Sequence, residues 1–111
     1  MSAQSIYLED LKNALLYLSA PLPIELEGEA KNWVATWAET QLEAEGTSKS
    51  EAIRNMQKEI VTAYDKLEAK AREGAKMKED EERLWRALSH YVAERGGKKK
   101  NDKEDMGPFF G

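Results

Sequence analysis

Two tryptophans, Trp33 and Trp37, constrain the fold of this 111-residue chain more than any other feature of its sequence. They lie four residues apart, and Ala30, Gln41 and Ala44 continue the same pattern of three- and four-residue steps. That spacing places both indole rings on one side of an α-helix, one turn apart. This helix is predicted to begin near Ile24, after Pro23, and to end at Gly46. Because no other segment offers as much apolar area, we expect the other helices to pack on this stripe.

Three further segments have helical patterns. Residues 5–19 carry leucines at a 3-4-3 spacing and precede Pro21, although residues 16–22 also alternate as a short strand would. A third helix opens at Ser48 with the capping-box motif SKSE. An apolar stripe at residues 84–92 defines a fourth helix, which ends at Gly96. Either the chain turns near Gly74 or one long helix continues through it, and we expect the break, because glycine costs about 1 kcal/mol inside a helix. The expected core residues are Leu11, Leu15, Trp33, Trp37, Ile53, Ile60, Leu67, Leu84 and Leu88.

These patterns predict an all-α protein, a small antiparallel three- or four-helix bundle formed by residues 1–95 as one domain. Leu, Ala, Glu and Lys dominate the sequence, so strands have little material from which to form. Residues 96–111, GGKKKNDKEDMGPFFG, have no periodicity and alternate clusters of charge. They are predicted to be a disordered charged tail that ends in an aromatic peptide.

Composition excludes several classes of protein. The chain has no cysteine, which rules out a disulfide scaffold and a thiolate zinc site. No apolar run approaches the roughly 20 residues that span a bilayer, and no signal-peptide pattern is present, so we expect a cytoplasmic protein without a membrane partner. The net charge is -4, and residues 1–45 hold eight acidic residues against two basic ones. Because this half would repel phosphate, nucleic acid is not an expected partner.

No residue pattern signals catalysis or metal binding. His90 is the only histidine, and we expect it to be exposed on a helix, without the nucleophile and orienting acid that catalysis requires. Position 87 is alanine, so His90 completes no Glu-x-x-His metal pair. The sequence has no phosphate-binding glycine loop. We therefore predict a protein that is not an enzyme and that holds neither a cofactor nor a metal.

Four aromatic residues are the candidate partner-binding residues. Trp33 and Trp37 could form a binding hot spot, although core packing is the alternative for both. Phe109 and Phe110 follow a polar tether and are similar to a short peptide that docks into a partner's pocket. The alternatives are an inert tail and a tail that folds back on the domain. We predict a non-catalytic protein-binding, adaptor or regulatory module whose partner is another protein. Dimerisation could complete its core, so a homodimer is possible.

One local resemblance suggests an alternative. The run GTSKSEAIR at residues 46–54 resembles the entry to the second helix of ribbon-helix-helix DNA-binding proteins, which include many antitoxins and plasmid repressors. Upstream, LPIEL at residues 22–26 looks like the strand-to-helix junction of that family. The resemblance implies a strand at Leu16–Leu22 whose outward residues Tyr17, Ser19 and Pro21 enter the major groove. The alternative function is thus a DNA-binding regulator or an antitoxin.

Overall fold

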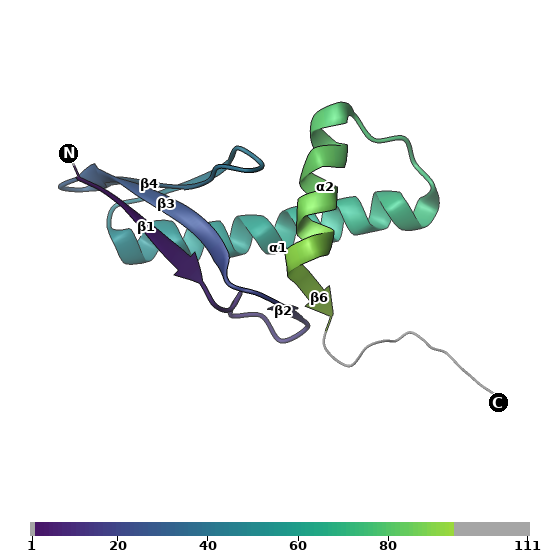
Figure 1. The fold of residues 1–111 in the computed structure, drawn as a ribbon, viewed down its shortest axis with the longest axis horizontal. Helices are drawn as coiled ribbons and strands as arrows, with labels where there is room; N and C mark the ends of the chain where they lie inside the picture. The colour runs from purple at the N-terminus through teal and green to yellow at the C-terminus, as the bar shows by residue number, and fades with distance from the viewer. Residues whose placement is uncertain (1, 95–111) are drawn as a thin grey trace.

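The computed structural model describes residues 2–94, and within them the fold is mixed α/β (Figure 1). The elements in chain order are β1 (Ser2–Leu8), β2 (Leu16–Leu18), β3 (Leu22–Glu29), β4 (Asn32–Trp37), β5 (Leu42–Gly46), α1 (Lys49–Glu73), α2 (Glu79–Tyr91) and β6 (Val92–Glu94). An antiparallel four-stranded sheet has the order β1-β3-β4-β5, and β2 pairs with β6. The predicted all-α helical bundle is therefore wrong.

The sheet forms because its central strands alternate between apolar and polar residues. Along β3, Leu22, Ile24 and Leu26 are buried while the residues between them are exposed. On β4, Ala35 and Trp37 are buried on the same side. Successive side chains of a strand point to opposite faces, so this pattern gives the sheet one apolar face and one solvated face.

Two glycines allow the close contacts that hold the sheet and the first helix together. A Cβ atom at Gly28 would meet the carbonyl oxygen of Asn32 and the indole of Trp33, so the β3–β4 hairpin requires glycine there. A Cβ atom at Gly46 would meet the backbone of Glu51 and Ala52, because α1 begins directly against β5. Gly46, which the sequence pattern assigned to the end of a helix, is a strand residue.

Helix α1 begins and ends as the sequence predicted. The Ser48 hydroxyl accepts a hydrogen bond from the Glu51 N–H at 3.1 Å and caps the helix. The Glu51 carboxylate reaches one residue further back than in the usual capping box and accepts from the N–H and hydroxyl of Thr47. Gly74 adopts the left-handed conformation, with φ 73°, so the predicted break between the last two helices is confirmed.

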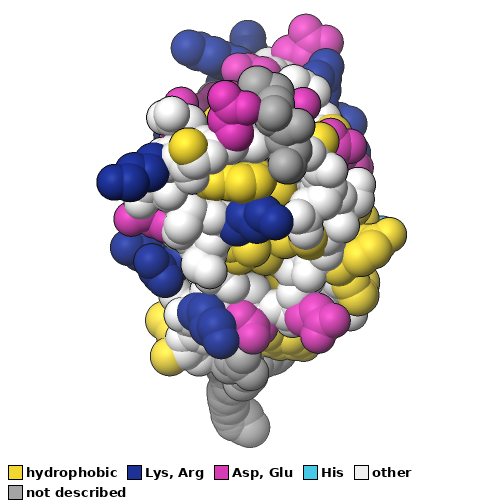
Figure 2. Space-filling model, turned by 90° about the vertical axis from the view of Figure 1, so that its left-hand side faces the viewer, with side chains coloured by type: hydrophobic (Ala, Val, Ile, Leu, Met, Phe, Trp, Pro, Cys, Tyr) yellow, Lys and Arg dark blue, Asp and Glu magenta, His cyan; other side chains and the backbone are white. Residues whose placement is uncertain are grey.

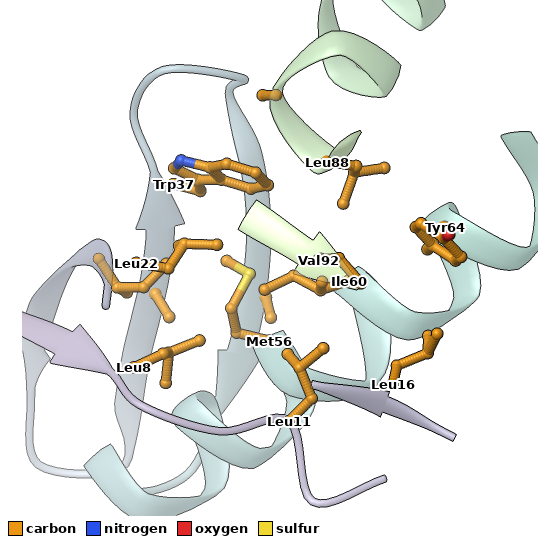
Figure 3. Close-up of a cluster of buried hydrophobic side chains, with 14 of the residues drawn as sticks. Leu8, Leu11, Leu16, Leu22, Trp37, Met56, Ile60, Tyr64, Leu88 and Val92 are labelled. Atoms are coloured by element: carbon orange, nitrogen blue, oxygen red, sulfur yellow. The ribbon is translucent and has the colours of Figure 1, made fainter. Parts of the chain in front are cut away.

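The hydrophobic core lies between the apolar sheet face and α1, and α2 closes it at one side (Figures 1 and 3). Helix α1 packs mainly against β5 and β4. Met56 of α1 lies at the centre, and the Trp37 ring meets Tyr91 of α2 edge-on with centroids 5.7 Å apart. Five expected core residues, Leu11, Trp37, Ile60, Leu67 and Leu88, are buried, and Trp33, Ile53 and Leu84 are half-buried, whereas Leu15 is 72% exposed.

The two segments before residue 46 that were predicted to be helical have other structures. Residues 5–19 contain the end of β1, a loop and β2, and the helix predicted after Pro23 is replaced by β3, β4 and β5. The ribbon-helix-helix resemblance implied a strand at Leu16–Leu22 followed by a helix. Instead, β2 pairs with β6 of the same chain, and a further strand follows it. The predicted tail at residues 96–111 lies outside the described residues.

The buried indole of Trp37 provides a test of this core. We expect Trp37→Ala to lower the free energy of unfolding by about 3–5 kcal/mol, because it leaves a large cavity between the sheet and the helices. The matched control is Tyr7→Ala, which removes an aromatic ring that is 65% exposed and should change stability by less than about 0.5 kcal/mol. Urea denaturation followed by circular dichroism measures both. Equal losses in the two variants would contradict the placement of Trp37.

A second prediction concerns the contact between the two helices. The ammonium of Lys70 at 2.7 Å, followed by the backbone N–H of Lys78, lowers the pKa of Glu81 from 4.5 to about 2. The folded state therefore favours the carboxylate, and its stabilising effect is present above pH 4.5 and lost as the pH falls from 4.5 to 2.

We expect Glu81→Gln to lower the melting temperature at pH 7, and the difference from the unchanged protein should vanish towards pH 2. The exposed neighbour Glu82 supplies the control, since Glu82→Gln should show a smaller difference at neutral pH. Thermal melts at a series of pH values measure this. A Glu81→Gln difference that stayed constant between pH 7 and pH 2 would refute the assignment.

Candidate functional site

A groove lies between the β1–β2 loop and the first half of α1. It encloses about 540 Å³. Helix α1 packs mainly against β5 and β4, and the groove lies where the β1–β2 loop meets the first half of the helix. Its lining residues are Leu11, Lys12, Ser50, Ile53, Arg54, Gln57 and Lys58.

The loop wall of the groove is anchored to the helix. Gln57, which is only 8% exposed, donates from Nε2 to the carbonyl oxygen of Asp10 at 3.1 Å. The next residue, Leu11, is buried and points into the core towards Met56 and Ile60 (Figure 3). Lys12 then adopts a left-handed backbone with φ 52°, a conformation that is uncommon for a residue with a side chain. A buried amide and a buried leucine thus fix the position of the loop.

The rim of the groove is cationic. Lys12, Arg54 and Lys58 are all exposed, and the lining includes no acidic residue. Lys12 lies 3.8 Å from Asp10, but that pair is exposed, and exposed ion pairs contribute little. Within residues 2–94, Arg54 and Lys58 form no ion pair. These two cations are therefore free to receive an anionic ligand.

Glu51, an acidic residue on the same helix, is hydrogen-bonded to Thr47. The N–H of Thr47, and then its hydroxyl, donate to the Glu51 carboxylate and lower its pKa, and Arg54 and Lys58 add a smaller electrostatic effect. Glu51 therefore does not close the groove by pairing with either cation. The floor between the cations is apolar, with buried Leu11 and half-buried Ile53. Such a surface suits a ligand that combines carboxylates with an apolar side chain.

The solvated face of the sheet has the opposite charge. Glu25 and Glu27 of β3 and Glu43 and Glu45 of β5 are exposed on it. The strand register places Thr36 between Glu25 and Glu43, and Val34 between Glu27 and Glu45. Each row therefore holds two carboxylates about 10 Å apart across β4. This face, hereafter the acidic face, has no basic residue in those rows and would repel phosphate.

The two tryptophans predicted to bind a partner have different environments. Trp37 is fully buried, and its Nε1 has no hydrogen-bond partner within the described part of the chain. Trp33 is half-buried and donates from Nε1 to the Ala30 carbonyl at 3.2 Å, with the Lys49 ammonium 5.1 Å from the ring centre. Figure 2 shows the end of the molecule near the N-terminus, where hydrophobic atoms lie between side chains of both charges. Phe109 and Phe110 lie outside the described residues.

His90 is exposed, as predicted, and its ring lies edge-on to Tyr91 with centroids 5.1 Å apart. Residues 2–94 contain no group of three or more histidines and carboxylates that could hold a metal ion. Neither helix of this part of the chain is long and apolar enough to cross a bilayer. Comparisons of the chain with protein families, curated proteins and solved structures give no match.

Sequence reasoning did not identify the groove. Arg54 and Lys58 lie one turn apart on a helix that was correctly predicted, so their shared face was available as a signal. The contribution of Lys12 could not be predicted, because it lies more than forty residues before Arg54 in the sequence, in a segment that was predicted to be a helix. The wall that it forms depends on the hydrogen bond between Gln57 and Asp10.

That hydrogen bond can be tested directly. We expect Gln57→Leu to lower the free energy of unfolding by about 1 kcal/mol, because the Asp10 carbonyl loses its protein donor. The amides of Leu11 and Lys12 should then exchange hydrogen faster. The control is Gln41→Leu, because Gln41 donates only within its own turn, to Ala38. The anchoring role would be contradicted if exchange at residues 11 and 12 became faster in the control, or if it stayed unchanged in Gln57→Leu.

Proposed function

We propose that this chain is a non-catalytic protein-binding module of the adaptor or regulatory type, and that the groove binds an acidic segment of a partner protein. The observation that carries the proposal is the cluster of Lys12, Arg54 and Lys58 around an apolar floor, in a chain whose net charge is -4. A cationic rim recognises carboxylates, and a buried apolar contact supplies the affinity that exposed ion pairs lack.

Two further features support binding rather than catalysis. The lining has no histidine, aspartate or glutamate that could act as a general base for Ser50, its one hydroxyl. The acidic face also opposes binding to a polyanion such as DNA, because its carboxylates add long-range repulsion. The cytoplasmic location expected from the sequence stays a prediction, which fractionation of the producing cells would test.

The test uses a synthetic peptide, acetyl-DELED-amide, titrated into the labelled protein and followed by NMR. We expect chemical-shift changes at Leu11, Ile53 and Gln57. The variant R54E/K58E should weaken binding roughly tenfold, because two exposed ion pairs at about 0.7 kcal/mol each are lost. Neither substitution touches the buried core.

The matched control is R83E/R86E, which makes the same change in net charge on the exposed side of α2. Equal weakening in both variants would show a non-specific charge effect and overturn the proposal, as would the absence of shifts at the groove. A twenty-base-pair duplex provides the second arm. Tight, steeply salt-dependent DNA binding that R54E/K58E abolishes would instead support a DNA-binding regulator.

A further inference from the structure

Within residues 2–94, the outer edge of β1 is a sheet edge to which no other strand is hydrogen-bonded. The strand order places β1 at one edge of the sheet and β5 at the other. Natural proteins protect edges with charge, proline, short strands or a covering helix. β5 is five residues long, carries Glu43 and Glu45, and packs against α1. β1 is seven residues long, SAQSIYL, with neither a charge nor a proline.

The free side of β1 can accept backbone hydrogen bonds along its whole length. All seven of its residues are in register with β3, from Ser2 opposite Gly28 to Leu8 opposite Leu22. In an antiparallel strand the N–H and C=O groups of alternate residues point to opposite sides, so about half of them point away from β3. Within residues 2–94 no other strand pairs with this side.

The β1–β2 loop connects this edge to the groove. β1 ends at Leu8, and the groove wall begins at Leu11. Gln4, Ile6 and Leu8 lie opposite the inner-facing residues of β3, so their side chains are on the same face of the sheet as α1. The Gln4 amide oxygen accepts a hydrogen bond from Lys49, the first residue of α1, at 2.8 Å. A strand added to β1 would therefore direct alternate side chains towards the groove.

We propose that the acidic partner segment binds as an extended strand on the free edge of β1, with its inward side chains over the groove. This inference rests on the proposed function and specifies its ligand. The residues of the partner segment that face inward are apolar or acidic, so that they can contact Ile53 or pair with Arg54 and Lys58. Outward positions lie beside Ser5 and Tyr7 and are neutral or aromatic, because Tyr7 is 65% exposed and offers a cross-strand contact.

A second copy of this chain fits the edge less well than such a segment. Full antiparallel self-pairing of β1 would centre on Ser5, and β1 has no carboxylate to offer the groove. The glutamates of the sheet point to the acidic face, away from the cations. Charge complementarity therefore selects a different, acidic chain.

The test compares two nonapeptides of identical composition, TETLTDTET and TTEDLETTT. The first places its acidic and leucine residues on one face of a strand, and the second divides them between both faces. We expect the first to bind at least about fivefold more tightly, and alternate β1 amides to exchange at least about tenfold more slowly at saturating peptide. The peptide amides should show contacts to β1 in isotope-filtered NMR.

Proline substitutions supply an independent readout. The N–H groups of Gln4 and Ser5 point to opposite sides of β1, one towards β3 and the other towards the free edge. Of the variants Gln4→Pro and Ser5→Pro, the one that removes the N–H at the free edge should therefore keep the fold. The variant that keeps its circular dichroism spectrum should bind TETLTDTET roughly fivefold more weakly. Hydrogen exchange in the unchanged protein decides the question if both variants unfold.

The outcomes separate the two proposals. Equal binding of both peptides, with shifts at the groove and unchanged β1 exchange, would overturn the strand inference and leave the proposed function standing. Absence of both peptides from the groove would overturn both. Protection of the β1 amides in the peptide-free protein, together with a dimer mass in sedimentation, would overturn the inference in favour of a second copy.

Discussion

The burial of one face of a four-stranded sheet by a single long helix determines the rest of this structure. Trp37, Met56 and Ile60 are fully buried where the sheet and α1 meet. α1 can approach β5 because Gly46 has no side chain to hold the two backbones apart. Without that contact, the apolar sides of β3 and β4 would be exposed, and an isolated sheet of this size would gain little from its hydrogen bonds alone.

The position of the helix also explains why the two edges of the sheet differ. α1 packs mainly against β5 and β4, and the rest of the core is completed by residues of the β1–β2 loop, of α2 and of the short β2–β6 pair. The loop meets α1 through Leu11 and Gln57 and leaves a groove beside them. The open edge and the groove are therefore two results of one off-centre helix.

The sequence predicted the two helices after residue 48 correctly and the structure before it wrongly, for a definable reason. Trp33 and Trp37 lie four residues apart, and a separation of four places two residues on the same side both of a helix and of a strand. The alternation at Leu22, Ile24 and Leu26 distinguishes the two cases. In α1, a serine cap and a glycine end accompany a repeat that only a helix satisfies.

The charged surfaces of the molecule depend on the fold and are not apparent in the order of residues along the sequence. The glutamates of β3 and β5 become a single acidic face only once β4 is placed between them. Likewise, Lys12 joins Arg54 and Lys58 only because the fold brings a loop to the helix. The net charge of -4 thus conceals a molecule that carries both a cationic groove and an acidic face. Such separation orients an approaching charged partner before contact, and here it would turn the groove, rather than the acidic face, towards an acidic chain.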